Sequence, residues 1–381
     1  MRSRTFIAIF LILSLLPALQ MITGLVPVAP VNENRRLAAW PASLAPIDSI
    51  PRAASDWFND HFGLRPLLIR LKTQIDYSVF RTSDRVLVGR DGWLFYRSTV
   101  NNEAPMVETM LASSKEADIV AGVRLFTEAL HKAGIRSVLV INMMSDRFYA
   151  DKLPAAAIRR PAHPRIDDLI AKLRLLPDVQ LVDSFAILRE TIKQRAVFHK
   201  TDFHWNDPAA FPVAEAIVDG MSKAEGLPQS AWKHKLEIQT MPSSGGIASF
   251  MPLFVPPSEQ ALMVKPNFTG PPGLVNSYDV GIFEQVTQAT PGTPGYLPST
   301  VFVGDSFLDG MIRAGIQSSF LATARARWKP DLKLSTIAEN LPVGTRWCVI
   351  EFIEVNLTAM GAFADLDDVA KAARILERRG S

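Results

Sequence analysis

The chain has 381 residues, of which 48% are hydrophobic, and its formal net charge is only +3. That charge is too small to indicate a nucleic-acid-binding surface, and the sequence has neither a long basic run nor an RNA-binding motif, so we exclude this class. The length allows one large domain with additions, or two modest domains. The single cysteine, Cys348, excludes an internal disulfide and is expected to be a small buried residue.

An uncharged, mostly apolar stretch extends from Thr5 to Asn32. It is longer than the roughly 20 apolar residues that a helix needs to cross a bilayer. A cleaved signal peptide is the alternative, but it would have a shorter apolar region, and only poor cleavage sites occur near Pro27 and Ala29. We therefore predict that residues 1–28 are a membrane anchor and that the rest of the chain is exported.

Residues 29–85 are predicted to be a tether rich in Pro and Ala, followed by a helical region. The apolar residues of 55–80 recur at helical spacing, and the pattern is interrupted near Gly63 and Pro66. Two short strands around a Gly-Arg-Asp-Gly turn are expected within residues 86–96.

Beyond residue 112 the pattern alternates between helices and strands, which favours a mostly parallel sheet covered on both faces. We predict one α/β domain over residues 86–381, with an irregular insertion at 226–299 where Pro and Gly are frequent. Asp207 is expected to cap the helix that begins at Pro208. The predicted helices are 112–131, 165–176, 186–196, 208–221, 307–326 and one from 366, and the predicted strands are 136–143, 179–185, 299–306 and 346–352.

The stretch Gly304-Asp305-Ser306 follows a predicted strand and precedes a predicted helix. Parallel sheets bind ligands beyond the carboxyl ends of their strands, which is where this serine would lie. Free amides at the start of the following helix can stabilise an oxyanion, and Gly304 allows a tight turn. The alternative is that Asp305 or Ser306 only caps the helix.

Asp202 and His204 lie in the polar stretch TDFHWND, residues 201–207. In an extended segment, side chains two residues apart share a face, with Cα atoms about 6.5 Å apart. The carboxylate can then orient the imidazole while the other ring nitrogen activates a nucleophile such as Ser306. A purely structural histidine is one alternative. A metal site that adds His199 is another, but a second ligand cluster is lacking, so we predict neither metal nor cofactor.

With both motifs present, the chain resembles the SGNH-like O-acetyltransferases of bacterial exopolysaccharide synthesis, the AlgJ/AlgX type. The similarity covers most of the chain, in the segments NENRRLAAWP, FNDHFGLR, VLVGRDGWLFY, YADKLP, TDFHWN and VGDSF. Asp-x-His precedes the serine here, which is the family's order and is permuted relative to ordinary SGNH esterases. Two departures stand out: Val355 replaces an arginine that members often carry in an E-x-x-E-R pattern, and GGIASFMPLF replaces a Gly-Asp-Leu run.

The resemblance implies that Ser306 is the nucleophile, His204 the general base and Asp202 its partner, in a three-layer α/β/α SGNH-like domain. It also implies a periplasmic protein held at the inner membrane. An alginate-like polysaccharide would be the acetyl acceptor, and a membrane-bound O-acyltransferase would supply the acetyl groups.

Three further residues are candidates for contacts with the substrate. Tyr149 follows a predicted strand at the carboxyl edge of the sheet, Trp205 adjoins the histidine, and Asp305 adjoins the serine. Two other functions stay open. A carbohydrate acetylesterase would use the same three catalytic residues, and an inactive, membrane-tethered polysaccharide-binding scaffold is favoured by the two departures from the family pattern.

Overall fold

The computed structural model describes residues 2–27, 31, 35–41 and 46–380. The predicted tether is therefore described only in part, and the cleavage candidate at Ala29 lies outside the described residues. Within those residues α1 (Arg2–Thr23) is the one helix that is long and apolar enough to cross a membrane. The division of the chain at residues 28 and 85 stays a prediction.

The helical region before the α/β domain has the predicted break. It consists of α2 (Ile50–His61), α3 (Arg65–Ile75) and a π-helical turn, η2 (Asp76–Phe80). Gly63 lies in the corner between α2 and α3, and Pro66 is at the start of α3, where its missing N–H costs no hydrogen bond. The antiparallel pair β1 (Val86–Val88) and β2 (Leu94–Tyr96) follows, as predicted.

A seven-stranded sheet forms the core of the α/β domain, in the order β4-β3-β11-β9-β10-β8-β7. The first five strands in this order are parallel, β8 pairs antiparallel with β10, and β7 pairs antiparallel with β8. The strands are β3 (Arg136–Asn142), β4 (Val179–Val182), β7 (Val275–Val280), β8 (Phe283–Gln288), β9 (Thr300–Gly304), β10 (Ala322–Arg327) and β11 (Trp347–Ile353). The central β9 and the inner part of β11 are fully buried, as expected for strands covered on both faces.

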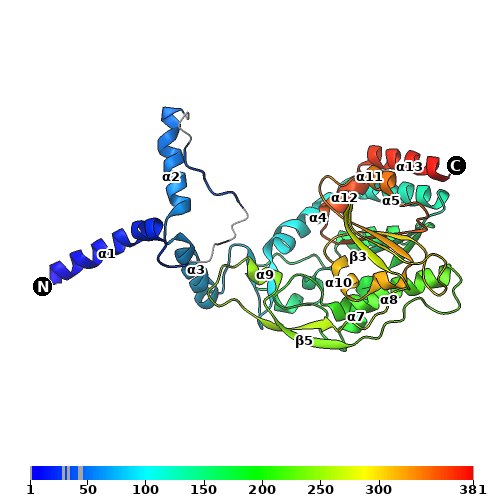
Figure 1. Ribbon diagram of the computed structural model, residues 1–381, viewed down its shortest axis with the longest axis horizontal. Coiled ribbons are helices and arrows are strands. Elements are labelled where there is room, and N and C mark those ends of the chain that lie inside the picture. Colours follow the sequence, from blue (N-terminus) through cyan, green and yellow to red (C-terminus); the bar gives the residue numbers. More distant parts are fainter. Residues whose placement is uncertain (1, 28–30, 32–34, 42–45, 381) are drawn as a thin grey trace.

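Helices cover both faces of this sheet, which confirms the predicted three-layer α/β/α architecture (Figure 1). One layer contains α5, α6, α11, α12 and α13, and the other contains α7, α8 and α10. The bounds are α4 (Ala104–Leu111), α5 (Lys115–Lys132), α6 (Arg165–Leu173), α7 (Ser184–Thr191), α8 (Asp207–Ala224), α10 (Leu308–Arg313), α11 (Leu334–Asn340), α12 (Leu357–Ala364) and α13 (Leu366–Gly380).

The prediction of one long helix over residues 307–326 is wrong. Helix α10 ends early, because Gly315 adopts a left-handed conformation with φ of 91° and a short 3₁₀ turn follows. The chain then enters β10, which pairs in parallel with β9. Its sequence, ATARAR, alternates small and basic residues, and this period of two is typical of a strand.

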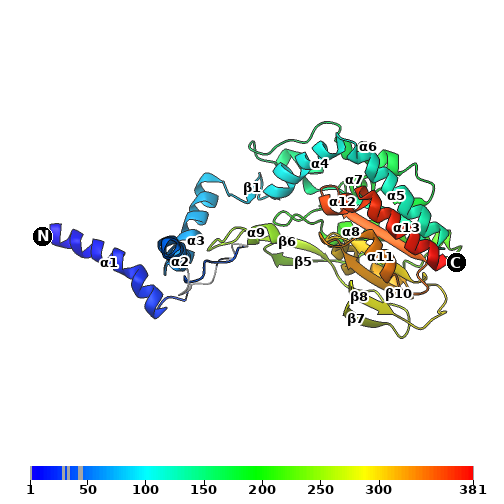
Figure 2. The same cartoon turned by 90° about the horizontal axis from the view of Figure 1, so that it is seen from above.

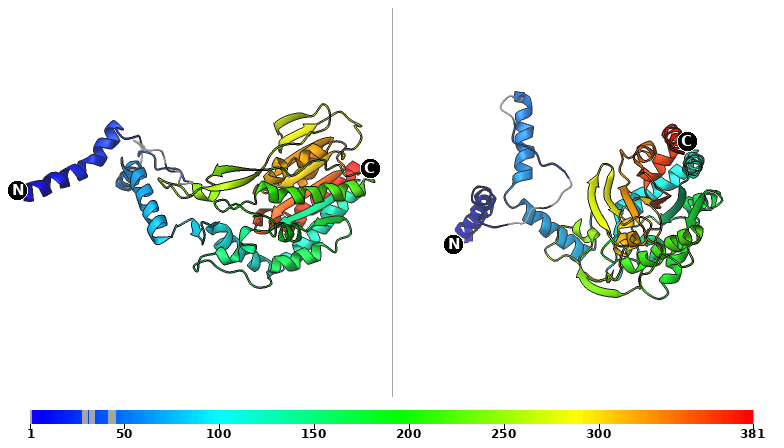
Figure 3. Two further views of the ribbon diagram at one scale, coloured as in Figure 1. Left: turned by 90° about the horizontal axis from the view of Figure 1, so that it is seen from below. Right: turned by 45° about the vertical axis from the view of Figure 1, so that its right-hand side comes forward.

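The prediction that residues 226–299 are irregular is also wrong in part. Two of the strands in this segment, β7 and β8, extend the central sheet at one edge. The other two, β5 (Ile238–Ser243) and β6 (Glu259–Val264), form a separate antiparallel ribbon, which leaves the domain toward α3 together with the short helix α9 (Gly246–Ser249) (Figures 2 and 3). The frequent Pro and Gly mark the turns between these strands rather than a lack of strands.

Gly122 of α5 packs directly against α12. A β-carbon at this position would lie 1.9 Å from the carbonyl oxygen of Phe363, so the backbones must separate to admit it. We expect Gly122→Ala to lower the free energy of unfolding by about 1–3 kcal/mol, measured by urea denaturation. Gly361→Ala in α12 is the matched control, because no atom lies within 4 Å of its β-carbon. An equal loss in both variants would contradict close packing at Gly122.

Candidate active site

Asp202 and His204 lie in the loop between α7 and α8. An isolated β-bridge between Phe198 and Trp205 closes this loop, and the residues between them form bends rather than the extended segment that we expected. The acid and the imidazole still meet, because the Asp202 carboxylate folds back on its own loop. Its Oδ1 accepts hydrogen bonds from the backbone N–H of His204 (3.1 Å) and from His204 Nδ1 (2.7 Å).

The second oxygen of Asp202 is held from another part of the chain. The backbone N–H of Gly246, at the start of α9, donates to Asp202 Oδ2 over 2.6 Å. Burial opposes ionisation of this carboxyl, but the hydrogen bonds from His204 and Gly246 outweigh it and hold the pKa of Asp202 well below its usual value. Asp202 is therefore a carboxylate whenever the protein is folded near neutral pH.

Ser306 lies in the turn between β9 and α10, as predicted. Its Oγ is 2.7 Å from Nε2 of His204. Because Nδ1 of the same ring faces Asp202, the geometry assigns the proton to Nδ1 and leaves Nε2 to accept the hydrogen bond from the serine hydroxyl. The two contacts occupy both ring nitrogens, so this arrangement leaves neither for the alternative metal site.

The structure thus brings together the three residues that the two motifs supplied. His204 and Ser306 are 102 residues apart in the sequence, and the three residues form one continuous chain of hydrogen bonds, from the carboxylate through the imidazole to the hydroxyl. The backbone N–H of Ser306 has no hydrogen-bond partner among the described residues, which leaves it free to donate to an oxyanion.

Asp305 does not bind substrate in this arrangement, contrary to the prediction, because its carboxylate is used inside the protein. Oδ1 accepts from the N–H of Phe307 (2.9 Å), and Oδ2 accepts from the N–H of Ile353 (2.8 Å) and from Asn356 Nδ2 (3.0 Å). Asp305 therefore fastens the turn that carries Ser306 to the end of β11.

The substrate-contact prediction for Trp205 is wrong as well. Its side chain is completely buried, and its Nε1 donates to the carbonyl oxygen of Phe307 over 3.0 Å. The indole packs beneath the site and ties the histidine loop to the serine turn. The side chain that lies against the imidazole is Phe203, with ring centroids 3.9 Å apart.

Tyr149 points largely into the protein. Its ring stacks on Trp93 with centroids 3.9 Å apart, and its hydroxyl accepts a hydrogen bond from the N–H of Val197 over 3.1 Å. Burial raises the pKa of this phenol. The contact with Val197 supports the segment that leads into the histidine loop, and a contact of Tyr149 with substrate stays a prediction.

Sequence reasoning missed several supports of the site. Glu259 of β6 accepts hydrogen bonds from the N–H groups of Lys200 (2.9 Å) and Thr201 (2.7 Å), and this anchors the start of the histidine loop. Gly245 and Gly246 approach the loop too closely for side chains, since a β-carbon on Gly245 would lie 2.6 Å from the Thr201 carbonyl. The adjacent glycines in GGIASF were the available signal for this close approach.

The predicted cap of helix α8 was misplaced by one residue. Asn206, rather than Asp207, accepts the hydrogen bond from the N–H of Ala209.

A buried glutamate lies under the serine turn. Glu351 of β11 has no exposed surface, and it accepts hydrogen bonds from the N–H of Asp305 (3.0 Å) and from Asn142 Nδ2 (2.7 Å). Burial, and secondly the nearby charge of Asp305, raise the pKa of Glu351 well above 4.5. A neutral Glu351 avoids placing two adjacent carboxylate charges beneath the site.

The raised pKa makes a prediction about stability. Above pH 4.5 the unfolded chain releases the Glu351 proton while the folded protein retains it, so this residue costs stability increasingly as the pH rises. Glu351→Gln keeps an acceptor for Asp305 N–H and cannot ionise. We therefore expect the free energy of unfolding of Glu351→Gln to increase relative to that of wild type as the pH rises from 4.5 to neutrality, measured by urea denaturation.

The exposed Glu190→Gln is the control for that comparison, and it should show no such trend. A difference between Glu351→Gln and wild type that did not change with pH would contradict a neutral Glu351.

Comparisons with known proteins show which proteins this chain is similar to. Residues 86–270 match the family described as "SGNH hydrolase-like domain, acetyltransferase AlgX", a range that includes Asp202 and His204 and ends before Ser306. The "Probable alginate O-acetylase AlgJ" of Pseudomonas putida is 26% identical over 213 residues, which cover 54% of this chain and 52% of that protein. The protein of the same description from Pseudomonas aeruginosa is 23% identical over 287 residues, which cover 74% of this chain and 67% of its own.

Among solved structures, the O-acetyltransferase domain of Pseudomonas putida AlgJ is similar with a TM-score of 0.49 and 18% identity, over 76% of this chain and 98% of that domain. The chain spans only about half the length of the first curated relative. Residues 86–270 are therefore similar to the SGNH hydrolase-like domain of the AlgX acetyltransferase family, and the chain is similar in sequence to the AlgJ proteins.

Proposed function

We propose that the protein is an O-acetyltransferase that acetylates hydroxyl groups of an alginate-like bacterial exopolysaccharide in the periplasm, through an acetyl-serine intermediate. The observation that carries this proposal is the hydrogen-bonded chain from Asp202 through His204 to Ser306, with both contacts at 2.7 Å. Such a chain makes a serine hydroxyl nucleophilic, because the imidazole takes its proton and the carboxylate stabilises the imidazolium that results.

The reaction has two steps with the same groups. In the first, His204 Nε2 takes the proton of Ser306, whose Oγ attacks the acetyl carbonyl of the donor; the leaving group then departs with the proton from the imidazolium. In the second, His204 takes the proton of a sugar hydroxyl, whose oxygen attacks the acetyl-serine, and the proton returns to Ser306 Oγ as the ester bond to the enzyme breaks. The N–H of Ser306 is placed to stabilise the oxyanion in both steps.

The acceptor class is inferred from the relatives. Both curated relatives are described as probable alginate O-acetylases, which supports an alginate-like polysaccharide as the acceptor. The apolar helix α1 supports a location at the inner membrane, where a membrane-bound O-acyltransferase would deliver the acetyl groups. In this arrangement the protein takes acetyl from a membrane partner and passes it to the polymer.

The assignment of the nucleophile is tested by Ser306→Ala. Without the hydroxyl no acetyl-enzyme forms, so release of nitrophenol from nitrophenyl acetate should fall by about a thousandfold or more. His204→Ala and Asp202→Ala should lose activity while their circular dichroism spectra and melting temperatures stay near those of wild type. Ser113→Ala, at an exposed position two residues after the end of α4, is the matched control and should keep the wild-type rate. Wild-type turnover by Ser306→Ala would contradict the assignment.

Transfer is distinguished from hydrolysis by the fate of the acetyl group. When alginate oligosaccharides are added, we expect acetylated oligosaccharide in mass spectra and a matching decrease in free acetate. Release of free acetate alone, unaffected by the acceptor, would identify an esterase. A protein that binds the oligosaccharide but is not labelled at Ser306 by a fluorophosphonate would instead be an inactive scaffold.

A further inference from the structure

The helices between the anchor and the α/β domain have an apolar face that the described residues leave uncovered. None of the residues of α2, α3 or η2 is buried. Four apolar residues follow one another at helical spacing, and each has a relative exposure between 42% and 67%: Leu68, Leu71, Ile75 and Val79. An amphipathic helix normally buries such a stripe, so a surface outside this chain is expected to cover it.

The same face contains a groove at the corner between the two helices. Phe58 of α2, Phe62 in the corner after it and Leu68 of α3 line this groove, which has a volume of about 540 Å³. Arg65 and Lys72 also line it; Lys72 pairs with Asp76 at 2.6 Å, and Arg65 lies 3.9 Å from Asp60. A lining of apolar and basic residues suits the boundary between acyl chains and anionic headgroups.

The corner also contacts the end of the candidate membrane span. A β-carbon on Gly63 would lie 2.4 Å from the carbonyl oxygen of Pro17 and 2.6 Å from the amide nitrogen of Met21, so this glycine packs directly on α1. Pro17 precedes the last residue of α1, Thr23, by six residues, or about 9 Å along the helix axis. Interfacial helices insert their apolar face about 5–10 Å into the headgroup region, which agrees with this depth.

The orientation of α2 fits the same surface. In Figure 1 α2 runs across the direction of α1, and in Figure 2 it is seen end-on while α1 is seen lengthwise. If α1 crosses the bilayer, α2 therefore lies roughly in the membrane plane. Trp40, which is 65% exposed, meets Trp57 of α2 edge to face with ring centroids 4.8 Å apart, and tryptophans are enriched at membrane interfaces.

We propose that α2, α3 and η2 form a membrane platform: an interfacial helix pair whose apolar face, from Phe58 to Val79, binds the lipid surface beside the anchor. This inference rests on the proposed location at the inner membrane. A lipid surface, rather than a partner protein, is favoured because the platform is continuous with α1 and lies at the depth of the headgroups.

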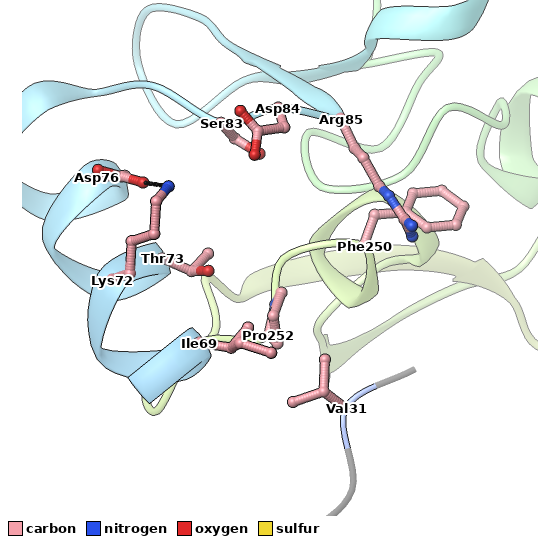
Figure 4. Close-up of a pocket in the computed structure, with 10 residues that line it drawn as sticks. All are labelled: Val31, Ile69, Lys72, Thr73, Asp76, Ser83, Asp84, Arg85, Phe250 and Pro252. Carbon is pink, nitrogen blue, oxygen red and sulfur yellow. Dashed lines mark hydrogen bonds and ion pairs between the residues drawn. The ribbon is translucent and has the colours of Figure 1, made fainter. Parts of the chain in front are cut away.

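The platform is joined to the α/β domain at the segment that follows α9. Gln74 Oε1 of α3 accepts hydrogen bonds from the N–H groups of Phe254 (3.1 Å) and Val255 (3.2 Å), in the segment that follows α9. Figure 4 shows the residues that line a cavity of about 180 Å³ between α3 and this segment, with Ile69 of α3 beside Pro252. The N–H of Gly246 at the start of α9 holds Asp202, so the platform fixes the height of the active site above the membrane.

The experiment uses the full chain in nanodiscs of phosphatidylethanolamine and phosphatidylglycerol. Cys348 is fully buried and burial raises the pKa of its thiol to about 12, so it does not react with a polar maleimide or iodoacetamide probe. Phe58→Cys, Leu71→Cys and Val79→Cys place one environment-sensitive fluorophore on the apolar face. Asp56→Cys, on the opposite side of α2, and Glu190→Cys, far from the anchor, are the matched controls.

On the apolar face we expect a blue shift of emission, quenching by lipids with a brominated acyl chain, and loss of quenching by aqueous iodide. The controls should show iodide quenching and no blue shift. Equal quenching by iodide on both faces of α2, with α1 still resistant to alkaline carbonate extraction, would overturn the platform and leave the anchor in place. If carbonate extracts the protein, both the platform and the anchor are overturned. Hydrolysis of nitrophenyl acetate by the same sample tests the catalytic proposal separately.

Discussion

The position of Ser306 depends on hydrogen bonds to two buried carboxyl groups. Glu351 accepts from the N–H of Asp305, and Asp305 accepts from the N–H groups of Phe307 and Ile353. These bonds connect the turn after β9 to its neighbour β11, which explains why the order of the central strands matters for the site. Burial, and secondly repulsion from Asp305, raise the pKa of Glu351, which favours a neutral Glu351 beside the Asp305 carboxylate.

The other half of the site depends on a loop with no regular structure of its own. Asp202 faces His204 because Gly246 holds one carboxylate oxygen and Glu259 holds the preceding backbone. Both supports come from the β5–β6 ribbon and α9, which lie outside the central sheet and reach toward α3 (Figure 3). The sheet therefore positions the serine, and the ribbon positions the acid and the base, so the catalytic contact at His204 Nε2 joins two separately supported parts.

The predictable features were those that depend on local order along the chain. Asp-x-His and Gly-Asp-Ser were visible as short motifs at the ends of regular elements, and the structure brings them together. The substrate contacts predicted for Trp205 and Asp305 failed for a different reason: adjacency in sequence does not reveal which way a side chain points. Likewise β10 was mistaken for helix, because parallel pairing with β9, which decides its conformation, is a tertiary interaction.

The two departures from the family pattern favoured an inactive scaffold at the level of sequence. The contacts that the structure shows at these two positions weaken that argument. Val355 stands where relatives often have an arginine, yet buried Glu354 retains counter-charges, with Arg160 at 3.0 Å and Arg147 at 3.7 Å, both from the segment after β3. In GGIASF, the N–H of Gly246 still orients the carboxylate of the acid–base pair. Glu354 thus receives its counter-charges from another part of the chain, and the altered GGIASF segment itself still supplies the N–H that holds Asp202.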